Sequence, residues 1–525
     1  MYNKNRIKIG IIGAGPNGLA SALPFLKEKN KFEVTIISSG KSLYDKDIIK
    51  LQNYLNSVDI NEKHKFWEKN VPKSKSLIPK KLFFGKSEVY ENFEKDLEVP
   101  KNIEFDISHT LGGLSNVWGA NVSEISNNDL SKFRYPQNLN YYLKKITSIY
   151  PISGFADDND TNKSIVYNKI PLNYCEQAKD IIHSYNKNRN FFLKKKIRFG
   201  YSKLAVSTFD TEKNSKIVSS GLEMYGCHNN SVFNSLHPIY KLKDEINIIE
   251  DTYVKEIMHN EHNIEILCKD LNNKQVNFNF DKLILAAGTM NTSKLVLKLL
   301  SKYNKKSLTI KDSQKYFFLY FTSTKSIINE EKTTTGLSQI FAQTEINNNT
   351  FHIQLYHSFL LLRDTLNNYI PNFLVKIIFK LFNFILGRLM IGVVYFPEEI
   401  SNHMKMTYDD KIKKFKLIAL KNKKFSVKYI LKIYAKLFSC LFKLKSLPLP
   451  IFIRSKIGVS QHFGSSLPPC ENETIGNTLK NGELAFYKNI YVTDCSSLNR
   501  IPSTPPTFIS MSNAYRISEN ITKNC

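Results

Sequence analysis

The chain opens with a pattern of apolar and glycine positions that predicts a strand, a turn, a helix and a second strand. Ile7 to Ile12 is a short apolar run rich in β-branched residues, which is typical of a buried strand. A glycine turn at 13–18 follows, then a helical stretch from Leu19 to Lys29 and a second apolar strand at Val34 to Ile37. This order is the context in which a glycine turn binds a dinucleotide.

Each glycine of this turn has its own physical role. Gly13 permits the tight turn, Gly15 lets the backbone approach a pyrophosphate, and Gly18 lets the helix pack close to the strand. The N-terminus of the helix then offers free N–H groups and the positive end of its dipole to phosphates. An acidic residue commonly ends the second strand and binds the ribose, but Ser38 stands there and is a weaker hydrogen-bonding group.

The middle of the chain is less regular. Residues 45–105 are polar and mixed, and we expect loops or a small lid; residues 131–195 carry helical patches. Residues 245–285 alternate apolar and polar positions between turns, which predicts a β-meander. Strand-like runs at Tyr316–Ser323 and Phe351–His357 predict an antiparallel sheet.

Two later segments, about 373–396 and 427–444, read as helices with a thin cationic edge and a wide apolar face. Lys376, Lys380 and Arg388 would each cost about 2.5–3.5 kcal/mol near the centre of a bilayer, which argues against a membrane-spanning helix. Two interpretations stay open. The helices lie in the headgroup region of an anionic membrane, or they pack into the protein with their lysines in water.

Composition narrows the class of protein. The length of 525 residues suits two to four domains or subdomains, and the formal net charge is +27. We expect no nucleic-acid partner, because zinc-ligand spacings and aromatic RNA-binding signatures are absent; lysine-rich solubilisation accounts for much of the charge. Seven cysteines without a CxxC pair favour a reducing compartment, and the polar first residues favour a cytoplasmic protein, with a peripheral place on the inner membrane face as a variant.

Three further segments sharpen this interpretation. They are the run Gly112 to Gly119 (GGLSNVWG), the strand ending in Ala286-Ala287-Gly288, and the C-terminal stretch from Gln461 to Phe508. Together with the first glycine turn, they resemble the glucose–methanol–choline (GMC) family of FAD-dependent oxidoreductases in their order and rough spacing. The GGLSNVWG form and the short segment after His462 look like a bacterial branch of that family.

The resemblance implies an α/β fold in which a Rossmann-like FAD-binding domain of the GMC type carries an inserted α+β substrate domain built on an antiparallel sheet. The FAD-binding domain is expected to be discontinuous, over residues 1–130, 196–311 and 456–525. The substrate-binding domain is expected over 131–195 and 312–455, with the two basic amphipathic helices inside it.

The resemblance also implies which residues contact FAD. The first glycines would hold the pyrophosphate, the loop at 112–116 would pass beside the flavin and ribityl chain, and the strand end at 287–288 would lie near the adenosine. Asp494 would bind the ribityl or pyrophosphate region, and the helix from Thr507 would point its N-terminus at the flavin. The full set is Gly13, Gly15, Gly18, Ser38, Gly112, Gly113, Ser115, Asn116, Ala287, Gly288, Asp494 and Thr507.

His462 is the candidate base, because a histidine with a near-neutral pKa suits removal of a hydroxyl proton. The family commonly places a second His or Asn near the C-terminal prolines, but the segment from Ser503 to Phe508 has neither. Asn499 and Asn513 lie near it in sequence and carry no assignment; Arg500 is read as a surface residue before an anion-binding one. Trp118 and Cys227 are read as structural.

The sequence thus predicts an FAD-dependent alcohol or sugar dehydrogenase or oxidase that passes a hydride to flavin N5 and uses no metal. The substrate is expected to be a small-molecule alcohol or sugar, with a lipid-linked alcohol and a quinone acceptor as reasons to visit a membrane. Two alternatives stay open: a hydroxylase or reductase on the same fold, and a degenerate non-catalytic protein that binds flavin or membrane.

Overall fold

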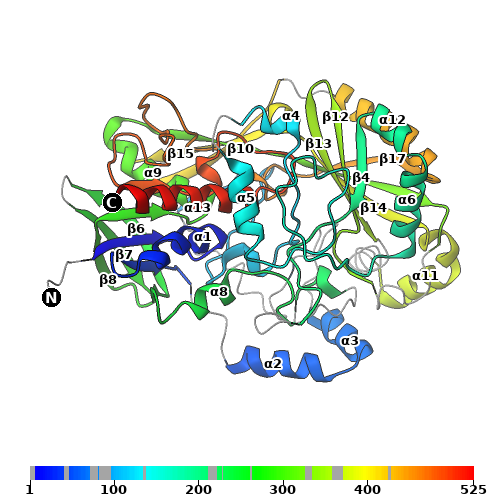
Figure 1. Cartoon of the computed structure of the whole chain (residues 1–525), viewed down its shortest axis with the longest axis horizontal. Helices are drawn as coiled ribbons and strands as arrows, with labels where there is room; N and C mark the ends of the chain where they lie inside the picture. Colours follow the sequence, from blue (N-terminus) through cyan, green and yellow to red (C-terminus); the bar gives the residue numbers. More distant parts are fainter. Residues whose placement is uncertain are drawn as a thin grey trace.

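The computed structural model describes residues 6–40, 46–70, 81, 96–133, 138–210, 222–227, 229–260, 263–325, 334–357, 370–423 and 427–525. Within these ranges the strands form four sheets, one parallel and the others antiparallel or mixed (Figure 1). The mixture of parallel and antiparallel sheets agrees with the α/β class expected from the sequence. The division into two domains stays a prediction.

The parallel sheet contains the predicted strand, turn, helix and strand. Its order is β19-β9-β1-β2-β5, so β1 lies in the middle. The chain passes from β1 to β2 and β5 on one side, and it later adds β9 and β19 on the other side. Such a reversal of strand order opens a crevice at the carboxyl ends of the strands. The strands are β1 (Ile7–Ile12), β2 (Phe32–Ile37), β5 (Asn247–Ile249), β9 (Lys282–Leu285) and β19 (Ile490–Val492).

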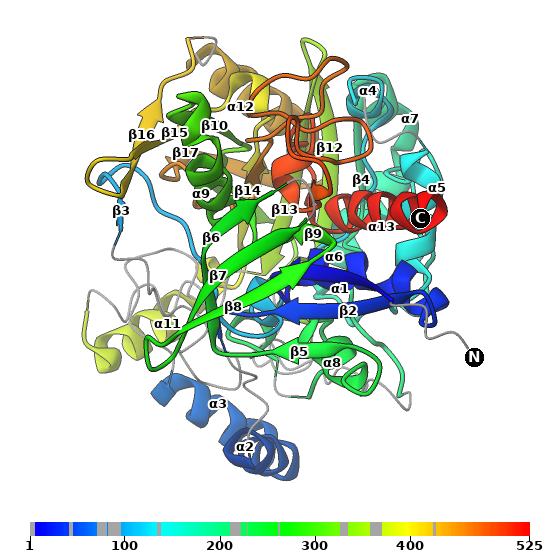
Figure 2. The same ribbon diagram turned by 90° about the vertical axis from the view of Figure 1, so that its left-hand side faces the viewer.

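Helices and the meander cover this sheet. The helix α1 (Pro16–Phe25) packs against the C-terminal helix α13 (Thr507–Asn524). The predicted meander is present as β6 (Thr252–His259), β7 (Ile264–Asp270) and β8 (Gln275–Phe280), and Figure 2 shows it beside the parallel sheet. The ring of Phe280 occupies the space that a Cβ at Gly10 would need, so the meander packs directly on β1.

A large antiparallel sheet lies at the other end of the molecule, with the order β17-β11-β14-β13-β12-β4 (Figure 1). It contains both predicted strand-like runs. Its strands are β4 (Ile197–Tyr201), β11 (Lys315–Thr322), β12 (Ile340–Ile346), β13 (Asn349–His357), β14 (Leu389–Tyr395) and β17 (Ser446–Arg454). A small mixed sheet joins β3 (Leu97–Glu98), β10 (Ser307–Asp312), β15 (His403–Asp409), β16 (Lys414–Leu420) and β18 (Phe463–Gly464).

The remaining helices follow the sequence pattern in part. The helical patches of 131–195 appear as α5 (Leu139–Thr147), α6 (Glu176–Lys187) and α7 (Arg189–Lys194). Shorter or connecting helices are α4 (Asn127–Leu130), α8 (Leu236–Lys241) and α9 (Thr289–Leu300). Among the residues described, no helix combines the length and the apolar composition needed to cross a membrane.

The segment 45–105, expected to form loops or a small lid, contains two helices, so the expectation of loops is partly wrong and that of a lid stays a prediction. Residues 46–70 form α2 (Lys46–Ser57) and α3 (Ile60–Asn70), while 71–80 and 82–95 lie outside the described residues. Trp67 of α3 is fully buried and stacks on Tyr225, with ring centroids 6.4 Å apart. Because Tyr225 lies far from α3 in sequence, the polar composition of 45–105 did not indicate this contact.

The helix predicted over 373–396 is also too long. The helix α11 (Asn372–Leu386) ends before Gly387, and β14 begins at Leu389. The apolar run that follows Gly387 is buried between two partner strands, β11 and β13. The second predicted helix, 427–444, is confirmed as α12 (Val427–Lys443).

We expect Gly392→Ala to destabilise the large antiparallel sheet. An added Cβ at this position would collide with the ring of Phe318, which is buried and stacked on Phe452 and so has little room to move. Overpacking of this kind costs about 1–3 kcal/mol in the free energy of unfolding, measurable by denaturant or thermal unfolding. An unchanged unfolding midpoint would mean that the Phe318 ring moves aside freely.

Candidate active site

Two cavities meet at the carboxyl ends of the parallel strands. The first, of about 220 Å³, is lined by the glycine turn, the end of β2, the turn between β9 and α9, and Asp494 after β19. The second, of about 400 Å³, is lined by His462, by residues of the large antiparallel sheet and by the start of α13. The two share Pro16, Asn17, Asp106 and Leu114, so they form one elongated cleft.

The glycines in and near the cleft differ in what an added side chain would meet. An added Cβ would collide with the carbonyl of Ala286 at Gly13, where φ is +110°, and with the carbonyl of Gly13 at Gly18. These two glycines therefore let backbone approach backbone, as the sequence analysis expected. At Gly15 and Gly288 an added Cβ would meet no protein atom within 4 Å, and both line the first cavity. Their bare backbone thus faces open space of the cleft.

Most of the residues implied to contact a cofactor line the cleft. The first cavity contains Gly13, Gly15, Ser38, Gly113, Ala287, Gly288 and Asp494, and the second contains Ser115, Thr507 and His462. Gly18, Gly112 and Asn116 are not among the lining residues and act in the local fold. Gly112 adopts a φ of +93°, and Asn116 donates its amide to the Leu111 carbonyl at 2.9 Å. Direct contact of any of these residues with a cofactor stays a prediction.

The part of the first cavity at the end of β2 is lined by Ser38 and by several lysines. Ser38 is buried and accepts a long hydrogen bond of 3.4 Å from the backbone N–H of Gly40. Lys255, Lys294 and Lys298 line the same cavity, and Lys294 forms an ion pair with Asp96 at 2.6 Å. Sequence reasoning missed these lysines, because they lie on β6 and α9 and only the fold brings them to the end of β2.

Asp494 and the start of α13 face the cleft from the C-terminal segment. Burial raises the pKa of Asp494, while its carboxylate accepts hydrogen bonds from the N–H of Ser496 at 2.8 Å and from the Thr292 hydroxyl. The helix α13 begins at Thr507 without a side-chain cap, and Pro506 and Thr507 line the second cavity, so the positive end of the helix dipole lies at that cavity.

His462 lies in the second cavity, stacked on Tyr395 with ring centroids 4.4 Å apart and planes 16° from parallel. Its Nδ1 is buried and makes no hydrogen bond to the described residues. Burial, together with His352 and the positive charge of Lys315, holds the pKa of His462 well below its usual value of 6.5. The imidazole is therefore neutral at neutral pH, with one ring nitrogen free of a proton.

The loop of His462 is held from β10. The Asp312 carboxylate accepts hydrogen bonds from the Gly458 N–H at 2.8 Å and from the Ser460 hydroxyl. The Ser460 oxygen in turn accepts the backbone N–H of His462 at 3.0 Å. Burial raises the pKa of Asp312 to about 6 in spite of these hydrogen bonds.

Neighbouring strands of the large antiparallel sheet supply one wall of the second cavity. Lys315 of β11 and Tyr395 of β14 are paired in register, and Tyr356 of β13 joins them in the lining. Burial lowers the pKa of Lys315 to about 8, against the pull of Asp106, Asp312 and Glu104. The Tyr356 hydroxyl donates to Gln354 Oε1 at 2.6 Å. None of these residues carried a motif signal in the sequence.

The C-terminal segment provides no second His or Asn to the cleft. Pro505, Pro506 and Thr507 line the second cavity, whereas Asn499 donates to the carbonyl of Lys132 and Asn513 to the Ser497 hydroxyl. Trp118 is a wall residue, as expected: it lines the second cavity and its Nε1 donates to the Phe233 carbonyl at 2.7 Å. Cys227 makes sulfur contacts to Asn229 and Ser231.

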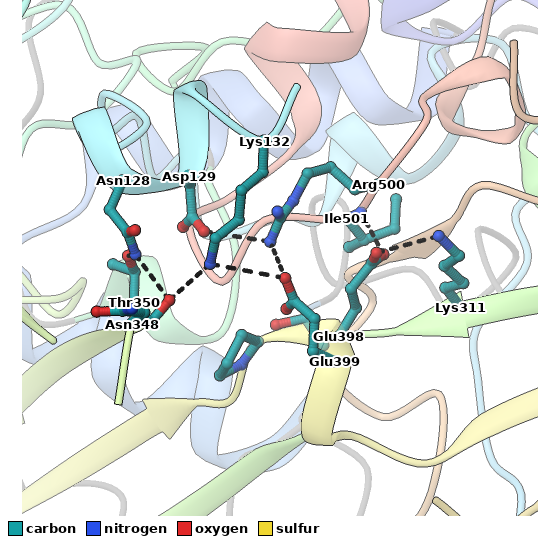
Figure 3. Close-up of polar contacts among 12 residues, drawn as sticks. Asn128, Asp129, Lys132, Lys311, Asn348, Thr350, Glu398, Glu399, Arg500 and Ile501 are labelled. Atoms are coloured by element: carbon teal, nitrogen blue, oxygen red, sulfur yellow. Dashed lines mark hydrogen bonds and ion pairs between the residues drawn. The ribbon is translucent and has the colours of Figure 1, made fainter. Parts of the chain in front are cut away.

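The interpretation of Arg500 as a surface residue is wrong, and it does not line the cleft. Its guanidinium is buried and pairs with Asp129 at 3.2 Å and Glu399 at 2.7 Å (Figure 3). Next to it, the backbone N–H of Ile501 donates to Glu398 at 2.7 Å. This network fixes the segment that leads into Pro505 and Pro506.

Comparisons with known proteins support the fold. No family model and no curated protein matches the sequence. A crystal structure of formate oxidase matches with a TM-score of 0.61 at 12% identity, covering 100% of this chain and 99% of that chain. Two arginine variants of the Aspergillus oryzae RIB40 formate oxidase, studied for FAD modification, match with TM-scores of 0.61 and 0.62 at 13% and 12% identity and the same coverage.

Formate oxidase is a GMC enzyme, so the described residues of this chain have the fold of a GMC oxidoreductase, while the expected arrangement of domains within it stays a prediction. At such low identity the likeness concerns the fold alone. The bacterial branch inferred from the segment Gly112 to Gly119 stays a prediction.

We expect the imidazole of His462 to stay neutral from alkaline pH down to well below pH 6.5, because its pKa is lowered. Histidine NMR of the ¹³C-labelled protein, assigned against His462→Gln, measures this directly. Lys315→Met removes a positive charge that opposes protonation, so the pKa of His462 should rise toward its usual value. A wild-type pKa at or above 6.5 would contradict the burial of the ring.

Proposed function

We propose that this chain is an FAD-dependent oxidoreductase that removes a hydride from a CH–OH carbon, with His462 as the base. The observation that carries the proposal is the continuity of the cleft, which runs from the glycine turn to His462 through four shared residues. A dinucleotide that begins at the glycine turn would then end beside the imidazole.

The residues of the first cavity suit the pyrophosphate of FAD. The bare backbone of Gly15 and Gly288 leaves space that a Cβ would fill, and the uncapped N-terminus of α1 offers N–H groups and a positive dipole end there. Asp494 would accept hydrogen bonds from hydroxyl groups of the ribityl chain. When bound, the flavin supplies the hydride acceptor at N5.

The second cavity supplies the proton chemistry. A neutral His462 would accept the hydroxyl proton of the substrate while the carbon loses its hydride. The stacked Tyr395 fixes the plane of the imidazole, so the accepting nitrogen keeps its direction. The Lys315 ammonium would stabilise negative charge on the substrate oxygen, and it also keeps His462 unprotonated.

The substrate class that we propose is a sugar, a polyol or a lipid-linked alcohol. A second candidate is a small anion that donates a hydride, as formate does for the formate oxidases. It is favoured by two half-buried lysines of the second cavity, Lys315 and Lys81, the pKa of each lowered to about 8 by desolvation. Anaerobic mixing of the purified protein with alcohols, sugars and formate, followed by bleaching of the flavin spectrum, separates the two.

We expect Gly15→Val to abolish flavin binding without loss of fold. The new side chain would project into open cleft space and not into protein, so thermal stability without cofactor should stay near that of the wild type. The flavin absorbance per protein should fall, whereas Ala435→Val, at an exposed position of α12, should retain it. A wild-type protein that carries no flavin and binds none when supplied would favour the non-catalytic alternative.

We expect His462→Ala to slow anaerobic flavin reduction by about 10²–10⁴-fold, because the general base is lost. The wild-type rate should not fall as pH goes from 8 to 6, since the lowered pKa keeps His462 unprotonated while Lys315, with a pKa of about 8, gains its proton over this range. The exposed His183 on α6 offers a matched control, His183→Ala, which should reduce at the wild-type rate. Equal rates for His462→Ala and wild type would remove the histidine-base mechanism and favour another flavin reaction.

A further inference from the structure

The helix α11 turns its apolar face to solvent. Leu381 is 72% exposed and Phe384 is 64% exposed, whereas Val375 is fully buried and fixes the opposite side of the helix to the protein. With about 3.6 residues per turn, most of the exposed positions fall on one side of the helix. They are Phe373, Leu374, Ile377, Leu381, Phe382, Phe384 and Ile385.

The two amphipathic helices therefore differ in how they use their apolar residues. On α12, Ile433, Leu437 and Leu441 are buried in the core, which is the packed arrangement. On α11 none of the described residues covers the apolar face in this way, and the exposed Lys376 and Lys380 lie along its edge. An exposed apolar surface with a basic edge is typical of helices that lie in a membrane interface.

Both helices end at the same end of the large antiparallel sheet, beside the last residues of β11. The Thr322 N–H donates to the carbonyl of Arg388, just after α11, and the Ser323 N–H donates to the carbonyl of Lys445, just after α12. Figure 1 places α11 and α12 at the same end of the long axis of the molecule. The last turns of α12 add the exposed Phe438 and Phe442 to this surface. We call the exposed residues of α11 and of the last turns of α12 the basic apolar end.

The charge of the basic apolar end selects its partner. The sequence has no acidic residue from 365 to 397 or from 411 to 470, while lysines recur throughout the second range. A second copy of the chain docked here would bring lysines against lysines. An anionic lipid surface offers the opposite charge and an apolar layer for the exposed side chains.

We propose that the basic apolar end docks on an anionic membrane surface, with α11 lying in the headgroup region. With 15 residues, α11 is about 22 Å long, shorter than the hydrocarbon core, and its lysines would stay among the headgroups. The strand β14 leads from this end to Tyr395 in the second cavity. Docking would therefore hold the cleft about 20 Å from the lipid, roughly the length of that strand.

Vesicle flotation with the full chain tests this proposal. We expect binding to vesicles of phosphatidylcholine mixed with phosphatidylglycerol, at least tenfold weaker binding to phosphatidylcholine alone, and weakening by salt. The double substitution Leu381→Ser with Phe384→Ser should reduce binding more than tenfold. Lys376→Glu with Lys380→Glu should do the same, because each lysine near an anionic surface contributes about fivefold.

Matched controls lie on the opposite part of the molecule, in the turn between β7 and β8. Leu271, which is 64% exposed, and the exposed Lys274 are changed by Leu271→Ser and Lys274→Glu, and both variants should bind vesicles as the wild type does. Absence of binding to anionic vesicles, or binding that the α11 variants leave unchanged, would overturn the proposal. So would sedimentation showing a dimer that Leu381→Ser with Phe384→Ser dissociates, because the surface would then join two copies.

Discussion

The structure depends on the close approach of α1 to the end of β1. At Gly18 the helix lies so near the Gly13 carbonyl that no side chain fits between them, and this contact points the first turn of the helix at the cleft. The C-terminal segment is then registered on the same turn, since Asn17 Nδ2 donates to the Thr493 carbonyl at 2.8 Å and the Ser510 hydroxyl donates to Asn17 Oδ1 at 3.1 Å. Hydrogen bonds thus join the first helix of the chain directly to its last helix and to the segment before it.

Buried charged residues hold the segments that line or lead to the cleft in place. Arg500 was read from the sequence as a surface residue, yet its ion pairs with Asp129 and Glu399 fix the segment that leads to the C-terminal prolines. Asp312 acts in a comparable way on the loop of His462 through the Gly458 N–H and the Ser460 hydroxyl. Removing one partner of such a buried network costs more than a surface ion pair would, because the other charge stays desolvated.

The sequence predicted those parts of the fold that local periodicity determines. The strand, turn, helix and strand at the N-terminus and the meander are of this kind, because alternation and glycine position specify them. The run after Gly387 was predicted as helix, but a short apolar segment is compatible with a buried helix and with a buried strand. Only the pairing of β14 with β11 and β13 decides between the two. The sequence analysis also missed the wall of the second cavity formed by Lys315, Tyr356 and Tyr395. These residues lie on strands far apart in sequence, and only the pairing of the strands brings them together.

The position of His462 has a mechanical consequence. Its backbone is tied through Ser460 to Asp312 on the small mixed sheet, while its ring rests on Tyr395 of the large antiparallel sheet. The residue therefore connects two separate sheets. If one sheet slid past the other, the orientation of the imidazole would change. A shift at the far end of the large sheet, where α11 and α12 end, would reach the imidazole through the strand β14 and the ring of Tyr395.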